Sequence, residues 1–185
     1  MNARELAATR VLTSETQKAV FFIGAFAALT FLGSLVRVYL PFTPVPVTLQ
    51  TLFVFLSVYY LRPGHAGLSQ SLYIFAGLIG APVFAAGITG ALILVGPTAG
   101  YLAGFIVAAV VMAFLYGKAG KMSVLKAAVI FTAGTVIIYS LGILNLVLVY
   151  KLSPVQAFTA GALPFIPGDV LKIAAAAAFC KIAVK

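Results

Sequence analysis

The chain has 185 residues, about the length of one domain, but its composition excludes an ordinary water-soluble one. Hydrophobic residues make up 63% of it and charged residues only 8%, against roughly 45–50% and about 25% in typical soluble domains. Its net charge of +9 comes from basic residues scattered between apolar stretches, without the clustered patch of a nucleic-acid-binding protein. We therefore expect an integral membrane protein that binds no nucleic acid.

Six segments are predicted to cross the membrane as helices, which makes the expected fold class all-α. A spanning helix needs about 20 apolar residues, or fewer where loops cover its end. Residues 1–18 are predicted to form a cytoplasmic N-terminal tail, and residues 19–185 a single six-helix transmembrane domain. The predicted spans are residues 19–40, 48–61, 66–79, 98–117, 123–150 and the stretch that follows Pro167 and Gly168.

Proline and glycine mark the connections between these segments. Pro41, Pro44 and Pro46 prevent a regular helix after the first span, because proline lacks the N–H donor. The apolar, glycine-rich stretch 83–97 is expected to form a loop or a partly helical segment at membrane depth. Ser153 followed by Pro154 predicts an N-cap that opens a short helix ending near residue 163.

The distribution of basic residues predicts that both termini are cytoplasmic. With six spans, the termini and the even-numbered turns lie on one side of the membrane. The other side carries Lys151 and, at helix ends, Arg37 and Lys172. The positive-inside rule assigns the cytoplasm to the side with nine of the twelve cations: Arg4, Arg10, Lys18, Arg62, Lys118, Lys121, Lys126, Lys181 and Lys185.

Asp169 and Lys172 are the first candidates for a binding site. An ionisable residue within a membrane helix costs about 2.5–3.5 kcal/mol on insertion scales, so it marks either a site or a paired structural feature. At i and i+3 the two residues share one helix face. Asp169 also falls in the expected first turn, where the helix dipole favours a negative charge. A purely structural pair therefore remains the alternative to ligand binding.

Several other residues each have two interpretations. Arg37 either extends to the membrane interface or contacts an anion. Gln50 either bonds to another helix or lines a pocket. Gly24 and Ala28 form a small-x-x-x-small step, which suits packing within the chain or docking to another membrane protein. Four aromatic residues fit either an interfacial belt or the wall of a small-molecule site: Phe42, Tyr73, Phe84 and Tyr101.

Motifs of common enzymes are absent from the sequence. Met122 follows Gly120 and Lys121 where a phosphate-binding loop requires Ser or Thr. His65 and Cys180 belong to different predicted elements, and no two carboxylates form a pair, so metal and nucleophilic catalysis are unsupported. We expect no catalytic activity, no metal and no cofactor, and a substrate-binding subunit that depends on other proteins for energy.

Four motifs, in order along the chain, resemble the BioY family. This family comprises the biotin-specific substrate-binding (S) components of energy-coupling-factor (ECF) transporters. The motifs are PFTPVPVTLQT at residues 41–51, GLIGAPVF at 77–84, GPTAGYLAGF at 96–105 and FIPGDVLK at 165–172. The other predicted spans are similar to the family only in hydropathy.

The resemblance implies an S-component-like bundle of six helices, lipid-embedded in the cell membrane, with cytoplasmic termini. It implies high-affinity capture of biotin from outside and its import by a module of one transmembrane coupling protein and two ABC ATPase subunits. The alternatives are an S component for a different vitamin and a stand-alone biotin facilitator. The family's coupling face lies on the first helix, where Gly24 and Ala28 lie here.

The resemblance also implies the residues that contact biotin. Asp169 and Lys172 match polar ligand contacts on the family's last helix. Lys172 is suited to the biotin carboxylate and Asp169 to a ureido N–H, although the orientation of biotin stays open. Ile88 and Leu102 stand where some members carry polar or basic residues. The other expected contacts are Thr43, Gln50, Phe84, Gly87, Thr98 and Tyr101.

Overall fold

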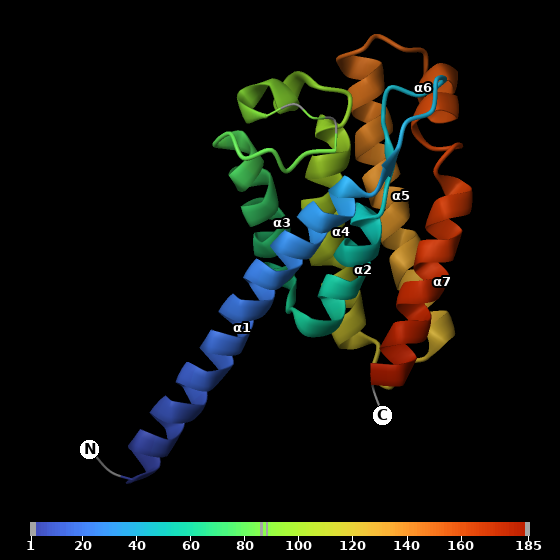
Figure 1. Cartoon of the computed structure of the whole chain (residues 1–185). Helices are drawn as coiled ribbons and strands as arrows, with labels where there is room; N and C mark the ends of the chain where they lie inside the picture. The colour runs from blue at the N-terminus through green and yellow to red at the C-terminus, as the bar shows by residue number, and fades with distance from the viewer. Residues whose placement is uncertain (1–2, 86, 88, 184–185) are drawn as a thin grey trace.

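The computed structural model describes residues 3–85, 87 and 89–183, which form a helical bundle with a small hairpin at one end (Figure 1). Both ends of the described chain lie at the end of the bundle opposite this hairpin. The elements are α1 (Ala3–Leu35), β1 (Arg37–Val38), β2 (Val47–Thr48), α2 (Gln50–Tyr60), α3 (Pro63–Leu78), the 3-10 helix η1 (Gly90–Val95), α4 (Ala99–Lys118), α5 (Val124–Leu148), α6 (Pro154–Gly161) and α7 (Ile166–Ala183).

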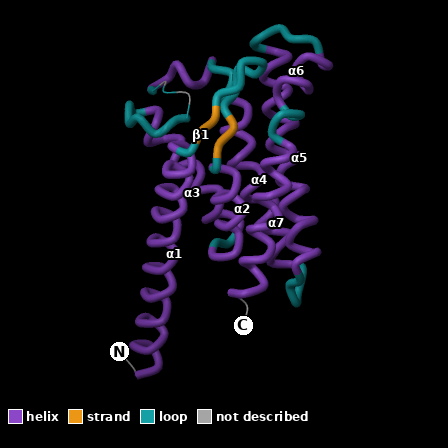
Figure 2. Tube along the Cα trace, turned by 45° about the vertical axis from the view of Figure 1, so that its right-hand side comes forward, coloured by secondary structure: helices purple, strands orange, loops and turns teal. Residues whose placement is uncertain are grey.

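The helices predicted from the sequence are present in the described residues. The boundaries of α2, α3, α4 and α5 lie within three residues of those predicted. In contrast, α1 begins at Ala3, so most of the segment expected to precede the first span is helical. The N-terminal half of α1 extends beyond the rest of the bundle (Figures 1 and 2).

A short antiparallel hairpin joins α1 to α2, with Arg37 opposite Thr48 (Figure 2). Its turn, residues 39–46, contains the three prolines that exclude a helix here. Thr43 stabilises the turn, because its hydroxyl accepts a hydrogen bond from the Val45 N–H at 3.2 Å. The strands were not expected, since two residues are too few to give an alternating pattern. The fold is thus all-α, as predicted, with the addition of this two-stranded hairpin.

The connection between α3 and α4 is a loop that ends in η1, in agreement with the loop or partly helical segment predicted at 83–97; residues 86 and 88 lie outside the described residues. Gly87 and Gly90 have φ of 72° and 69°. Glycine adopts this left-handed region without the penalty that a Cβ imposes. The Ser34 hydroxyl of α1 donates to the Val83 carbonyl at 2.8 Å. This contact fixes the start of the loop against the bundle.

Helices α6 and α7 follow each other across a bend of 52°. The predicted cap of α6 is confirmed: Ser153 Oγ accepts from the Gln156 N–H at 3.3 Å, and the Gln156 side chain accepts from the Ser153 N–H at 3.0 Å. Pro154 occupies the first helical position of this capping box. After the bend, Asp169 lies in the first turn of α7. The bend therefore brings the start of α7 into the bundle.

Helices α4 and α5 pack closely because glycines of α4 face the backbone of α5. A Cβ at Gly100 would collide with the carbonyl oxygen of Leu141, whereas a Cβ at Gly117 of the same helix would have no atom within 4 Å. We expect Gly100→Ala to lower the free energy of unfolding by about 1–3 kcal/mol, the usual cost of overpacking. Thermal unfolding in detergent measures this loss. Gly117→Ala is the matched control, and equal melting temperatures for the two variants would contradict the packing argument.

The outside of the bundle is strongly apolar, as lipid contact requires. Leu125 is 74% exposed, and Val155 and Leu171 are each 73% exposed. Within the described residues, Ser14–Leu35, α4 and α5 are each long and apolar enough to span a membrane, and α6 with α7 can count as a fourth, bent span. Helix α2 is apolar but shorter. The count of six spans stays a prediction.

Candidate ligand-binding site

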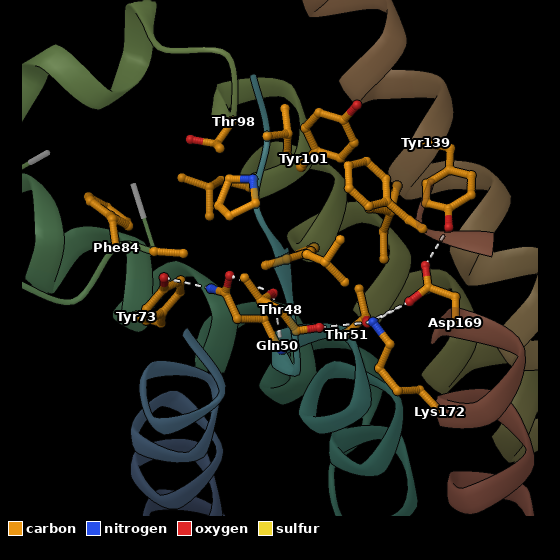
Figure 3. Close-up of a pocket in the computed structure, with 18 residues that line it drawn as sticks. Thr48, Gln50, Thr51, Tyr73, Phe84, Thr98, Tyr101, Tyr139, Asp169 and Lys172 are labelled. Atoms are coloured by element: carbon orange, nitrogen blue, oxygen red, sulfur yellow. Dashed lines mark hydrogen bonds and ion pairs between the residues drawn. The ribbon is translucent and has the colours of Figure 1, made fainter. Parts of the chain in front are cut away.

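A cavity lies at the hairpin end of the bundle, among β2, α2, α3, α4, α5 and α7 (Figure 3). It holds about 600 Å³ of space, part of it open to the surroundings. Small-molecule sites are mainly apolar with a few polar groups. The lining fits this description: Val45, Pro46, Val47, Thr48, Gln50, Thr51, Tyr73, Phe84, Ala85, Thr98, Tyr101, Leu102, Phe105, Ile138, Tyr139, Phe165, Asp169 and Lys172.

Asp169 and Lys172 form an ion pair at one end of the cavity (Figure 3), with side chains only 4% and 9% exposed. Lys172 Nζ also donates to the Thr48 carbonyl at 2.9 Å and to the Thr51 hydroxyl at 2.8 Å. The Thr51 hydroxyl in turn donates to Asp169 Oδ1 at 3.1 Å. The Tyr139 hydroxyl donates to Asp169 Oδ2. Both buried charges are thus paired and hydrogen-bonded, as burial in an apolar bundle demands.

These contacts leave the two charged groups with different capacities for further hydrogen bonds. The three N–H donors of the Lys172 ammonium have three partners in Asp169, Thr48 and Thr51. The Asp169 carboxylate can accept about four hydrogen bonds and receives three, from Lys172, Thr51 and Tyr139. Asp169 therefore offers a ligand one more acceptor position, while the Lys172 donors are occupied. This end is suited to a neutral group that carries an N–H.

A second hydrogen-bonded group lies at the other end of the cavity (Figure 3). Gln50 Nε2 donates to the Tyr73 hydroxyl at 2.7 Å, and that hydroxyl donates to the Val83 carbonyl at 3.1 Å. The Thr48 hydroxyl donates to Gln50 Oε1 at 3.1 Å. The Phe84 ring meets the Tyr73 ring edge-on, with centroids 5.7 Å apart. These contacts hold the loop before η1 against α2 and α3.

The wall between the two ends is mostly aromatic and aliphatic. Tyr101 lines it with a hydroxyl that is already engaged, since it donates to the Gly161 carbonyl at 2.7 Å. Its ring lies edge-on to Phe165, with centroids 6.3 Å apart. The buried Thr98 hydroxyl has no hydrogen-bond partner among the described residues. A polar ligand atom near Thr98 would satisfy it.

Six of the eight predicted contact residues line this cavity: Asp169, Lys172, Gln50, Phe84, Thr98 and Tyr101. Both interpretations of Gln50 hold, because it lines the cavity and bonds to Tyr73 of another helix. Thr43 and Gly87 are not among the lining residues. Thr43 holds the hairpin turn and Gly87 allows a left-handed backbone, so ligand contact by these two stays a prediction.

Thr51 and Tyr139 were not identified as site residues from the sequence, although both bond to Asp169. Tyr139 lies within α5, which is apolar around its whole circumference. Such a helix gives no sign of which face points inward. Tyr139 and Ser140 form a polar pair in this segment, but Thr132, Thr135 and Asn145 are polar as well, so the pair alone does not identify a site residue.

Gly24 and Ala28 lie on an exposed part of α1 and do not line the cavity. A Cβ at Gly24 would meet no atom within 4 Å. Packing within the described chain therefore gives no reason for a glycine at this position. Docking of another membrane protein on this small-residue face stays a prediction.

In the described part of the chain, no group of three or more His, Cys, Asp or Glu side chains lies together. What the cavity provides is one buried ion pair, several hydroxyls and an apolar wall. This arrangement is suited to the binding of a small molecule.

Comparison with known proteins identifies the family of the chain. The BioY family model matches residues 5–185. The biotin transporter BioY of Thermotoga maritima is 40% identical over 155 residues, which are 83% of this chain and 88% of that protein. Biotin transporters BioY of Rhodobacter capsulatus and Rhizobium etli are 38% and 36% identical, over 85% and 82% of this chain and 88% and 84% of their own.

A solved structure shares the fold. It is the crystal structure of the S-component for biotin from an ECF-type ABC transporter, with a TM-score of 0.85 and 21% identity. The match covers 93% of this chain and 94% of that one. With its long apolar helices, the chain is a multi-pass membrane protein and belongs to the BioY family.

Proposed function

We propose that this chain binds biotin in the cavity and serves as the substrate-specific subunit of an ECF-type ABC importer. Relatives named biotin transporters support this, since they match 82–85% of the chain. The observation that carries the proposal is the buried end of the cavity, where Asp169 keeps one acceptor position beside a fully bonded Lys172. The ureido ring of biotin is a neutral group with N–H donors, which this position suits.

We further propose that the ureido ring lies at Asp169 and that the acid tail runs toward Phe84. An ureido N–H donates to Asp169 in a charge-assisted hydrogen bond. In the reverse orientation, the biotin carboxylate would compete with Asp169 for one ammonium and add a net negative charge to a buried neutral pair, which is costly. The sulfur-containing ring and the methylenes of the tail fit the wall formed by Tyr101 and Phe165.

The proposed topology has six spans, α1 to α5 and α7, with both termini in the cytoplasm. Residues 1–18 precede the membrane domain, which is residues 19–185. Support comes from the shared end of the bundle at which the described termini lie and from the cations on the same side of the predicted topology. In this orientation the cavity faces the outside of the cell.

The energy for import is proposed to come from an ECF module of one transmembrane coupling protein and two ABC ATPase subunits, docked on α1 at Gly24 and Ala28. The sequence has no phosphate-binding loop of its own. The exposed small residues on α1 allow a partner helix to approach closely. The chain is therefore proposed to capture biotin without acting as an enzyme.

Calorimetric titration of the purified chain in detergent tests the function. We expect one saturable site for biotin with a dissociation constant below about 1 μM, or about −8 kcal/mol. A chain that ignores biotin but gains thermal stability with another vitamin would instead be an S component for that vitamin. Accumulation of labelled biotin in liposomes that contain the chain alone, without ATP, would indicate a stand-alone facilitator.

A further inference from the structure

Arg37 is an exposed residue that does not itself line the cavity but bonds to Ala85, which lines it next to Phe84, at the end opposite the ion pair. Its guanidinium donates from Nη1 to the Ala85 carbonyl at 2.8 Å, and Ala85 lines the cavity. The Tyr39 hydroxyl donates to the same carbonyl at 2.7 Å. Arg37 is itself fixed in the hairpin, where it pairs with Thr48, another lining residue. The pairing with Thr48 and the bond to the Ala85 carbonyl thus hold the guanidinium beside the cavity.

This guanidinium has no anionic partner among the described side chains. The two described carboxylates are Asp169, paired with Lys172, and Glu15, paired with Lys18. An arginine has five N–H donors in a planar fork that matches a carboxylate. The guanidinium also lies over the Tyr39 ring, with Cζ 5.8 Å from the ring centroid. Neither this contact nor the bond to the Ala85 carbonyl occupies the remaining N–H donors, which stay available to a ligand.

We propose that Arg37 binds the carboxylate of the ligand at the mouth of the cavity. The inference rests on the proposed binding of biotin and identifies the residue that recognises its acid group. At the inner end, the Lys172 donors are occupied, so the acid must find its donors elsewhere, and a free cation suits it best. Each end of the cavity therefore binds a different end of the ligand: Asp169 binds the ureido head, and Arg37 binds the carboxylate of the tail.

The test compares biotin with biotin amide, which keeps the ureido ring and tail but lacks the negative charge. Arg37→Ala should weaken the binding of biotin by about three- to tenfold, because an exposed charge pair contributes a modest energy. It should change the binding of the amide by less than about twofold. Arg37→Lys should restore part of the preference for the acid. Raising the salt concentration should weaken biotin binding to the unmodified chain and leave amide binding unchanged.

Two controls separate a direct contact from indirect effects. Lys151→Ala removes another exposed cation on the same side of the predicted topology and should preserve the ratio of the two affinities, which excludes a general effect of net charge. Tyr39→Phe removes the other bond to the Ala85 carbonyl. If that change shifts the loop, it should weaken the binding of biotin and the binding of biotin amide equally.

The proposal is overturned if Arg37→Ala leaves the biotin-to-amide ratio unchanged, whether both affinities stay the same or fall together. In that case the unmodified chain still binds biotin, and only the role of Arg37 fails. If the unmodified chain binds neither compound, the proposed function fails as well.

Discussion

Asp169→Asn is expected to weaken biotin binding at least tenfold, or about 1.4 kcal/mol. Asparagine keeps the size of the side chain but removes the charge that strengthens the bond to the ureido N–H. Lys172→Ala should have an effect of similar size, because the carboxylate then loses the partner that orients it. Calorimetry with the purified variants measures both. Unchanged titrations would remove the cavity assignment.

A loss of folding must be separated from a loss of binding in this test. Asp169→Asn leaves the buried Lys172 ammonium without its counter-ion, and breaking such a pair costs about 3–5 kcal/mol. The matched control is the double variant Asp169→Asn with Lys172→Met, which removes both charges. Removal of both charges leaves no uncompensated buried charge, which is the main cost of breaking one partner of such a pair. We expect the double variant to regain the melting temperature but not the affinity for biotin.

Gly24→Leu or Ala28→Leu is expected to preserve biotin binding and to reduce biotin uptake by cells at least about tenfold. Both positions are exposed on α1 and are not among the residues that line the cavity, so a larger side chain leaves the ligand site intact. A leucine on a small-residue face prevents the close approach of another helix. Labelled biotin uptake and co-purification of the ATPase subunits measure the effect.

The control for this docking face is Ala178→Leu, an equal increase in size at an exposed position of α7. Uptake by this variant should match that of the unmodified chain. If the α1 variants also transport normally, the docking face lies elsewhere. If they lose biotin binding as well, α1 acts through the fold of the binding domain and not through a partner.

The helices were predictable because their signals are local. Apolar runs near 20 residues long predict spans, and a capping sequence such as Ser153-Pro154 predicts where a helix begins. The same holds for Asp169 and Lys172, which stand out because a charge in an apolar segment is expensive. For such features the sequence near a residue contains most of the physical information.

The rest of the site depends on contacts between distant segments. Tyr139 reaches Asp169 across 30 residues, and Arg37 reaches Ala85 across 48. Such pairs follow from how α5 rotates against α7 and how the hairpin lies against the loop before η1. Glycines such as Gly100 contribute to these packings through the absence of a side chain. No local pattern encodes that geometry.

The separation of polar ends from an apolar middle has a consequence for selectivity among analogues. An apolar wall discriminates weakly, by about 10- to 200-fold for one methylene, whereas a site built for a hydrogen bond rejects molecules that lack it far more strongly. Compounds with a shortened tail or without the ring sulfur should therefore act as competitors of the vitamin. Compounds with an altered urea should be excluded, because Asp169, held by Thr51 and Tyr139, is matched to that group.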